Sequence, residues 1–305
     1  MDLRQLRHLT AIVEKGSFSA AAKSLNLTQP ALTRSMNALE QSVAAALLVR
    51  KTNGIEPTSA GQVLYDYARL LLAGAENARA DITRIAQGIG GELTVGIGTH
   101  LAELVLPAVL SKFAALHPHL SISIKTGMIE QLLPMVLDGK IELVGTMIPA
   151  DGIQGLIAYE RVFTTLDYVY AGLNHKLAGT RATIPFEDLV EQRWVALDTP
   201  HAQIYFNRFF SSAGAGNPRQ VFRSDSLAML RSMIESGDWL GIMPAEYMKK
   251  SEARSLRVKG LPLVRACGLL TRADIPLRPI VAEFGSVMRT EMLRLQHPRA
   301  SLPVG

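Results

Sequence analysis

Two helical patterns follow each other with scarcely a gap in SFSAAAKSLNLTQPALTRSMNALE, residues 17–40. The first pattern has apolar residues at the i, i+3, i+4 and i+7 positions of a helix, which are Phe18, Ala21, Ala22 and Leu25. Ser17 is suited to cap this helix, and Thr28 with Pro30 is suited to the cap and first turn of the next. Because the residues between them leave room only for a tight turn, the stretch predicts a helix-turn-helix.

The outward face of the second helix carries side chains that can read base edges. On a helical wheel, apolar residues fall on one side, at Leu32, Met36, Leu39 and Val43. On the polar side, arginine can bond guanine, asparagine can bond adenine, and threonine can contact thymine or phosphate. We therefore predict DNA contacts from Thr28, Gln29, Pro30, Thr33, Arg34 and Asn37. The alternative is an ordinary solvated helix face.

The segment LLVRKTNGIEPTS predicts a β-hairpin after the helix-turn-helix. Asn53 and Gly54 both accept positive φ, which favours a two-residue turn. Arg50, Lys51 and Asn53 are placed to reach the DNA backbone or minor groove, unless this is an ordinary surface hairpin. Residues 1–58 contain seven basic and four acidic side chains, and the resulting net charge of +3 agrees with a DNA-facing module.

As far as residue 65, the sequence resembles the LysR-type transcriptional regulators. It has, in the family's order, a first helix LRQLRHLTAIVEKG, the stretch GSFSAAAKSLNLTQPALTRSMNALE, a leucine-rich run ending in Arg50, a wing, and PTSAG opening a long helix. Two positions depart from the pattern, since Ala44 replaces a glycine after the third helix and Leu48 replaces a phenylalanine before the wing. The resemblance implies a cytoplasmic regulator whose expected partners are double-stranded promoter DNA and RNA polymerase.

Residues 58–89 predict one long helix whose apolar residues are spaced almost as in a coiled coil. The predicted seam consists of Leu64, Tyr67, Leu71, Ala75, Ala78, Ile82 and Ile85. Such a seam packs either on the chain's own body or on a second copy, and the resemblance implies a homodimer or homotetramer. The glycine-rich QGIGG that follows, residues 87–91, predicts a hinge.

From Glu92 onward strand and helix patterns alternate, beginning with ELTVGIGT, LAELVLPAVLSKFAALHP and LSISIKTG. This order predicts an α/β domain with a largely parallel, doubly wound sheet. It resembles the two-lobed effector domain of the same family, which is related to periplasmic binding proteins. The predicted domains are an all-α winged helix-turn-helix at 1–58, a linker helix and hinge at 59–91, and an effector-binding domain at 92–305. Its lobe I is residues 92–161 and 267–305, and its lobe II is residues 162–266.

Ligands of open parallel sheets bind where strands end and helices begin. In this chain those turns hold Thr99, His100, Met128, Ile129, Thr146, Thr199, Pro200 and His201. The positions match the family's effector cleft, although each could instead be a structural loop residue. No arginine is among them, and Met128 stands where the family more often has a polar residue. We therefore predict a small-molecule effector that is an aromatic or weakly polar acid.

The sequence disfavours several other classes of protein. Cys267 is the only cysteine, which excludes an intramolecular disulfide and a cysteine-rich metal site. No nucleophile elbow, Walker loop or H-E-x-x-H motif appears, so we predict no enzyme, no metal and no cofactor. The absence of a signal peptide and of a long uncharged apolar run indicates a cytoplasmic protein that does not insert into a membrane. The alternative function is that of an effector-independent DNA-architectural or repressor protein.

Overall fold

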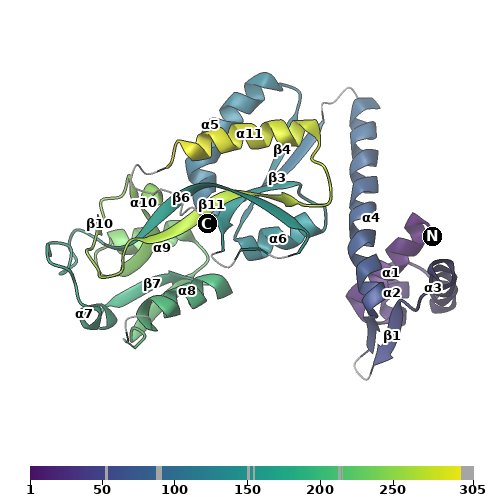
Figure 1. The fold of residues 1–305 in the computed structure, drawn as a ribbon, viewed down its shortest axis with the longest axis horizontal. Coiled ribbons are helices and arrows are strands. Elements are labelled where there is room, and N and C mark those ends of the chain that lie inside the picture. Colours follow the sequence, from purple (N-terminus) through teal and green to yellow (C-terminus); the bar gives the residue numbers. More distant parts are fainter. Residues whose placement is uncertain are drawn as a thin grey trace. The chain divides into compact units, whose positions relative to one another are not determined.

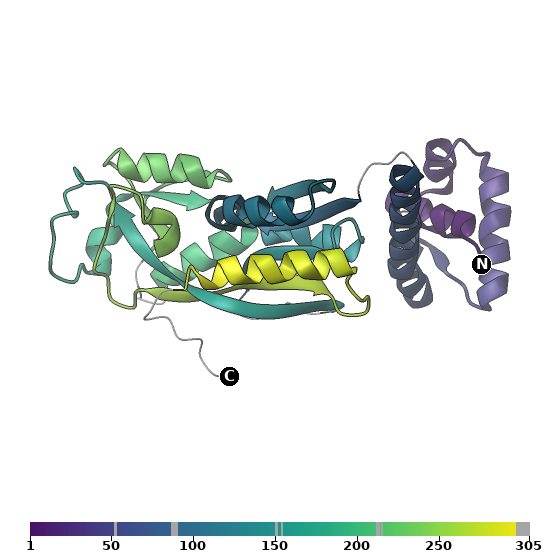
Figure 2. The same cartoon turned by 90° about the horizontal axis from the view of Figure 1, so that it is seen from above.

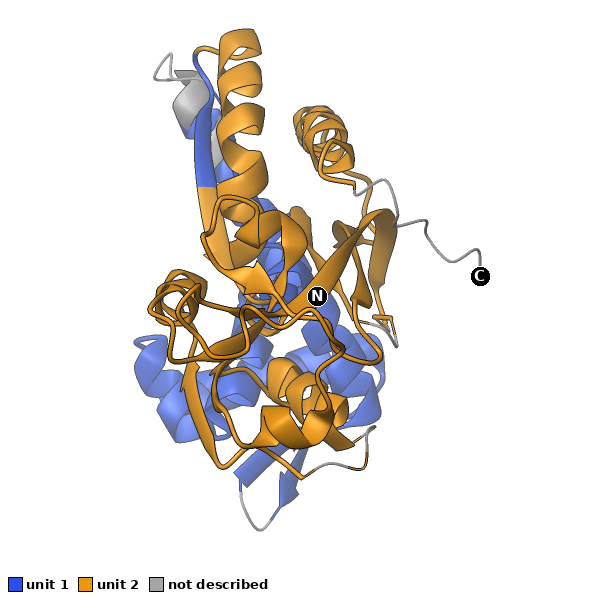
Figure 3. Ribbon diagram, turned by 90° about the vertical axis from the view of Figure 1, so that its left-hand side faces the viewer, with its two compact units in different colours: residues 1–95, 119–123, 133–142 blue, residues 96–118, 124–132, 143–305 orange. Residues whose placement is uncertain are grey.

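The computed structural model describes residues 1–51, 54–86, 91–149, 152–153, 155–211, 214 and 216–296. The chain divides into two compact units, which Figure 3 distinguishes by colour. The first unit consists of residues 1–95, 119–123 and 133–142, and the second of residues 96–118, 124–132 and 143–305. The domain boundaries predicted above stay a prediction.

Three short helices at the start of the first unit confirm the predicted helix-turn-helix. They are α1 Leu3–Lys15, α2 Phe18–Ser24 and α3 Gln29–Val43 (Figure 1). Each begins after a side chain that accepts a backbone hydrogen bond, namely Asp2, Ser17 and Thr28. Their buried core is formed by Leu9, Ile12, Ala21, Ala22, Leu32, Met36, Leu39 and Leu47. The apolar side predicted for α3 is therefore the side that packs inward.

The wing and the long helix share a rigid junction. The wing pairs β1 Leu48–Lys51 antiparallel with β2 Gly54–Pro57, and α4 then runs over Ser59–Ala86, inside the predicted range. The backbone N–H of Thr58 donates to the Leu47 carbonyl at 2.9 Å, and its Oγ1 donates to the Ala46 carbonyl at 2.7 Å. Gly61 is required here because a Cβ would lie 1.8 Å from the Leu47 carbonyl oxygen. The start of the wing is thus joined to the start of α4 by one backbone hydrogen bond, one side-chain hydrogen bond and a close backbone approach.

Ala44 ends α3 in the left-handed conformation, with φ of 52° and ψ of 33°. The N–H of Ala45 donates to the Glu40 carbonyl at 3.2 Å, and the N–H of Ala44 donates to the Gln41 carbonyl at 3.3 Å. This is the hydrogen-bond pattern of a Schellman motif. The chain therefore keeps the turn that normally has a glycine, with an alanine in a conformation that alanine disfavours.

We predict that Ala44→Gly raises the free energy of unfolding by about 0.5–1 kcal/mol, because glycine adopts positive φ without a Cβ clash. The control is Ala38→Gly at an exposed position inside α3, which should lower the free energy of unfolding by about 1 kcal/mol. Urea denaturation of both variants measures the two effects. A loss of stability in Ala44→Gly would show that Ala44 is not strained.

A mixed nine-stranded sheet carries the other elements, in the order β4-β3-β5-β11-β6-β9-β7-β8, with β10 paired to β6. Its strands are β3 Glu92–Gly98, β4 Ser121–Gly127, β5 Leu143–Ile148, β6 Ile157–Ala171, β7 Arg193–Leu197, β8 Gln220–Ser224, β9 Leu240–Pro244, β10 Arg254–Ser255 and β11 Leu263–Arg272. The helices are α5 Thr99–Leu116, α6 Ile129–Leu137, α7 Phe186–Val190, α8 Pro200–Ser211, α9 Leu227–Glu235, α10 Ala245–Met248 and α11 Pro279–Leu293.

The prediction of a largely parallel sheet is wrong for the middle of this sheet. β11 runs antiparallel to both β5 and β6, and β6 runs antiparallel to β9. Parallel pairing joins β3 to β5 at one side, and β7 to β8 and β9 at the other. The long strands β6 and β11 lie side by side between these two halves (Figure 1). Neither strand directly follows a helix of the alternating pattern, so that pattern could not indicate its direction.

The second unit is built around buried aromatic side chains. Trp194 is fully buried against Phe206 and Phe210, and its Nε1 donates to the Leu189 carbonyl at 2.8 Å. Within the described chain, only α5 is long and apolar enough to cross a membrane, by length and composition alone. Here α5 lies beside α11 (Figures 1 and 2), with Phe113 fully buried and edge-to-face on Phe284. These contacts make α5 a core helix of this domain.

A candidate nucleic-acid interface and a candidate effector site

Helix α3 presents its predicted DNA-reading face to solvent. The exposed side chains are those of Thr28, Gln29, Pro30, Arg34 and Asn37, whereas Thr33 is half-buried. Both threonines are used locally, because Thr28 Oγ1 accepts from the Ala31 N–H at 3.4 Å and Thr33 Oγ1 donates to the Gln29 carbonyl at 3.0 Å. The side chains of Gln29, Arg34 and Asn37 have no such local hydrogen bond within the described residues, so they are the groups on this face that are fully free to reach base edges.

The basic side chains of α3 and the wing differ in their ionic partners. Lys51 Nζ lies 2.6 Å from Glu56 Oε2 on the other strand of the wing. Over the described part of the chain, no carboxylate forms an ion pair with Arg34 or Arg50. Both arginines are exposed, so their guanidinium groups are open to phosphate or guanine. Asn53, the remaining predicted contact, lies outside the described residues.

A histidine that was not predicted as a site residue fixes α3 to α1. His8 is buried, and its Nδ1 lies 2.7 Å from Ser35 Oγ, on the inward side of α3. Burial lowers the pKa of His8, and the nearby Arg4 lowers it further, so the imidazole stays neutral near pH 7. The only signal for this role in the sequence was that His8 precedes the apolar Ile12 by four residues, and so lies on the same face of the helix. His8 thus helps to hold the predicted DNA-reading face of α3 in place.

An apolar stripe follows the exposed side of α4. Tyr67, Leu71 and Ile82 are 50%, 48% and 67% exposed, and large apolar side chains gathered on one face mark an interaction surface. Ala75 is half-buried and Ala78 is exposed, while the side chain of Ile85 lies outside the described residues. The prediction for Leu64 needs correction, because Leu64 packs against the buried core of its own helix-turn-helix. This leaves Tyr67, Leu71, Ala78 and Ile82 as the seam residues that are exposed.

In lobe I, the predicted effector residues Thr99 and Thr146 both lie next to Gly98, where β3 ends and α5 begins. Gly98 occupies the N-cap position of α5 and so supplies no side-chain acceptor to the first turn. The nearest atom to a Cβ built on Gly98 would be Thr146 Oγ1, at 2.8 Å. Thr146 is 3% exposed and lies within β5 itself, not after the strand as predicted. Thr146 and the half-buried Thr99 therefore flank the open amino terminus of a long helix.

The other predicted effector residues have local or apolar contacts. Met128 packs against the buried cluster that contains Tyr170, Met243 and Tyr247, and its N–H donates to Gln131 Oε1 at 3.0 Å. Ile129, the first residue of α6, is half-buried. In the second lobe, Thr199 Oγ1 accepts from the Ala202 N–H at 3.2 Å and so caps α8. Pro200 and His201 are exposed at the start of that helix.

His100, predicted to line the effector cleft, has a buried side chain. His100 is 6% exposed, because the second residue of α5 faces the sheet, and its Nε2 lies 3.7 Å from Cys267 Sγ. Burial lowers the pKa of His100 to about 3, and the positive charge of Arg265 contributes in the same direction. Burial also raises the pKa of the Cys267 thiol. At neutral pH both groups are therefore uncharged parts of the interior.

A buried ion pair beside His100 was not predicted. Arg265 Nη2 of β11 lies 2.6 Å from Asp167 Oδ2 of β6, and Asp167 is fully buried. The guanidinium also lies over the ring of Tyr205, at 4.8 Å, and the Tyr205 hydroxyl donates to Asp167 Oδ2 at 3.5 Å. Burial raises the pKa of Asp167, and Arg265 opposes that shift. An arginine therefore does lie near the predicted cleft, where β11 brings it from a distant part of the sequence.

Two family models match the chain. Residues 3–62 match the bacterial regulatory helix-turn-helix protein model of the lysR family, and residues 86–293 match the LysR substrate binding domain. The second match alone covers more than half of the chain. The predicted DNA-binding segment and effector domain thus each correspond to a known module.

Similar proteins and structures agree with this assignment. The SDS degradation transcriptional activation protein of a Pseudomonas strain is 36% identical over 285 residues, covering 91% of this chain and 92% of the relative. The transcriptional dual regulator OxyR of Escherichia coli is 25% identical over 304 residues, covering 96% of each chain. The fold is similar to that of full-length OxyR from Pseudomonas aeruginosa, with a TM-score of 0.61, 20% identity and 99% coverage of each chain.

A further structure with this fold is full-length CbnR in complex with its target DNA. It has a TM-score of 0.57 and 24% identity, and the match covers 95% of this chain and 100% of CbnR. The two family matches, the relative at 36% identity and the shared fold lead to one conclusion. This chain belongs to the LysR family of DNA-binding transcriptional regulators and carries the effector-binding domain of that family.

Proposed function

We propose that this protein binds promoter DNA through α3 and the wing, and that a small molecule in the cleft between the lobes changes promoter binding or activation. The observation that carries the DNA-binding part is the exposed face of α3, on which Arg34 has no ionic partner among the described residues. Gln29 and Asn37 share that face, and Arg50 adds an unpaired charge on the wing. RNA polymerase is the expected protein partner, and the cytoplasm is the expected location.

The proposed assembly is a homodimer or homotetramer that pairs through α4. Exposed Tyr67, Leu71 and Ile82 support this, because a helix face with large apolar side chains gains free energy when a second copy covers it. Two copies would also present two α3 helices to a pseudo-palindromic site. Leu64 is not part of the proposed seam, since it is already packed within its own chain.

The proposed effector site centres on the start of α5. An uncapped helix amino terminus favours a negatively charged group, and Thr99 and Thr146 can add hydroxyl hydrogen bonds. Arg265, although paired with Asp167, adds an electropositive group near this region and supports an acid as the effector. On the lobe II side, the proposal keeps Thr199, Pro200 and His201 at the start of α8. It does not keep His100, which is buried against Cys267.

Arg34→Ala tests the DNA-binding part of the proposal. We expect it to weaken binding to the preferred operator by about 1–3 kcal/mol and to relax base choice at one position, because one arginine reads one guanine. The operator is first selected from a random DNA pool, and fluorescence anisotropy then compares it with single-base variants at fixed salt.

Lys51→Ala is the matched control for this measurement. Lys51 lies on the wing, beside Glu56. Because a lysine that contacts phosphate carries no base preference, its removal should weaken binding to all DNA sequences alike and reduce the salt dependence of binding. Equal affinity and equal base preference for wild type and Arg34→Ala would remove α3 from the reading role. The same loss on every sequence for both variants would restrict Arg34 to the DNA backbone.

A further inference from the structure

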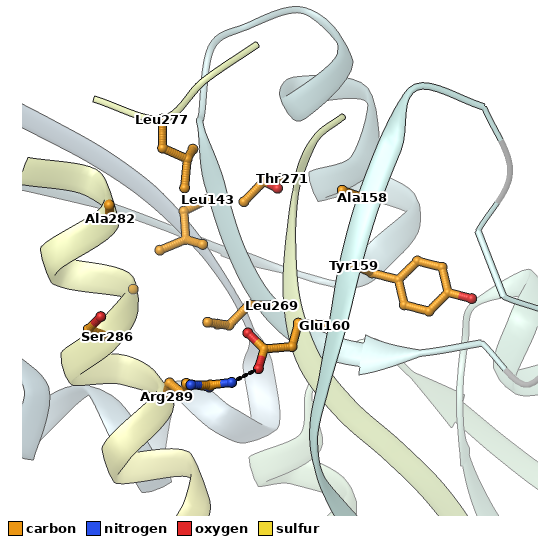
Figure 4. A pocket seen from close by; sticks show the side chains of 11 residues that line it. Leu143, Ala158, Tyr159, Glu160, Leu269, Thr271, Leu277, Ala282, Ser286 and Arg289 are labelled. Carbon is orange, nitrogen blue, oxygen red and sulfur yellow. Dashed lines mark hydrogen bonds and ion pairs between the residues drawn. The ribbon is translucent and has the colours of Figure 1, made fainter. Parts of the chain in front are cut away.

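A cavity of about 390 Å³ lies between α11 and the strands β5, β6 and β11 of the second unit (Figure 4). This volume is within the range of small-molecule sites in proteins. Leu143, Leu269 and Leu277 form apolar walls, and Thr271 and Ser286 add hydroxyl groups. The cavity shares no residue with the proposed effector site at the start of α5.

Small residues on α11 and β6 leave this space open. Ala282 and Gly285 of α11 and Ala158 of β6 line it. A glycine inside a helix lowers helix stability by roughly 1 kcal/mol relative to alanine, so Gly285 calls for a local reason. A Cβ on Gly285 would lie 3.4 Å from Leu143 Cδ2, which is van der Waals contact at the cavity wall. Small side chains therefore line the hollow on both the α11 side and the β6 side.

One ion pair provides the charge of the cavity. Arg289 of α11 and Glu160 of β6 point toward each other in Figure 4 and form an ion pair. Their side chains are 52% and 45% exposed, so water screens the attraction between them. Exposed pairs of this kind contribute little stability. An anion that bonds the Arg289 guanidinium more strongly than Glu160 does can therefore replace Glu160 with little loss of folding stability.

We propose that this cavity binds a small amphiphilic anion, with a carboxylate or sulfate head on an apolar body. The head bonds to Arg289 in place of Glu160, and the body packs on Leu143, Leu269 and Leu277. Arginine suits this role because its planar group can donate two parallel hydrogen bonds to a carboxylate or sulfate. The ligand would also touch β6 and β11, the strands that hold the Asp167–Arg265 pair further along. This site goes beyond the proposed function and does not depend on it.

Octanoate is the probe, and octan-1-ol, which has the same apolar body without the charge, is its control. Calorimetric titration of the full chain should show that octanoate binds more tightly than octan-1-ol. Arg289→Gln should weaken octanoate binding at least about tenfold, because a hydrogen bond to a charged group is lost. Glu160→Gln should strengthen octanoate binding about threefold, because the competing carboxylate is gone. Neither change should affect octan-1-ol.

Two further variants make the outcome decisive. Ala282→Trp should fill the cavity and abolish binding of both probes, with folding checked by the thermal unfolding temperature. Thr146→Val alters the proposed effector site and should leave octanoate binding unchanged. The proposal is overturned if wild type does not bind octanoate, or if Arg289→Gln and Glu160→Gln do not shift affinity in opposite directions. It is also overturned if Thr146→Val abolishes binding, since octanoate would then occupy the effector site.

Discussion

Arg265→Met should lower the free energy of unfolding by about 3–5 kcal/mol, because it leaves the carboxylate of Asp167 buried without its positive partner. Asp167 is fully buried, and the only other described hydrogen bond to its carboxylate is the 3.5 Å bond from Tyr205. A single hydrogen bond cannot compensate for removing a carboxylate from water. Chemical denaturation of the full chain, followed by the fluorescence of the buried Trp194, measures the loss.

Two controls separate this effect from the simple loss of an arginine. Arg219→Met removes an 82% exposed arginine that pairs with Glu191 on the surface, and it should change stability by less than about 1 kcal/mol. The double variant Asp167→Leu with Arg265→Met removes both charges and should recover most of the loss. If the double variant is as unstable as Arg265→Met alone, the loss comes from packing and not from an unpaired charge.

Lowering the pH from 7 to 4.5 should destabilise wild type by about 2.5 kcal/mol more than His100→Gln, at about 1.4 kcal/mol per pKa unit. The folded pKa of His100 is about 3, because burial holds it well below the usual histidine value of 6.5. Below pH 6.5 the unfolded chain therefore binds a proton at this site, and the folded chain does not until about pH 3. The stability due to the neutral imidazole is present above the unfolded pKa and is lost as the pH falls.

The measurement is urea denaturation of both proteins at pH 7 and at pH 4.5. Comparing the pH-induced changes cancels the contribution of other titrating groups, including Asp167, which faces the same cluster. His201→Gln, at an exposed position, is the matched histidine control. If wild type and His100→Gln lose equal stability, His100 is protonated in the folded state at pH 4.5 and the burial argument fails.

The DNA-binding part of the fold could be predicted because its determinants are local. Ser17, Thr28 and Pro30 mark helix ends within a few residues of the apolar positions that they organise. Ala44 shows the limit of such reasoning, since the absent glycine left the turn geometry open. The structure keeps the left-handed turn because two backbone hydrogen bonds and the side chain of Glu40 hold it.

The effector domain was predicted less well because its site depends on long-range pairing. Asp167 and Arg265 are far apart in the sequence, and only the antiparallel register of β6 and β11 brings them together. His100 was assigned to the cleft because of its place after a strand. A position at a strand end does not determine which way a side chain turns, and His100 turns inward toward Cys267.

Because Gly61 lies so close to the Leu47 carbonyl, the wing and α4 move as one rigid piece. Thr58 bonds the same strand end, so α4 cannot tilt without moving the wing with it. The 28 residues of α4 make this rigid piece about 42 Å long, at about 1.5 Å per residue. A tilt of about 5° at one end therefore displaces the other by about 4 Å, slightly more than the rise of about 3.4 Å per base pair along the DNA axis. In the proposed dimer, a small change in the angle between the two α4 helices would therefore change the half-site spacing that the two wings can reach.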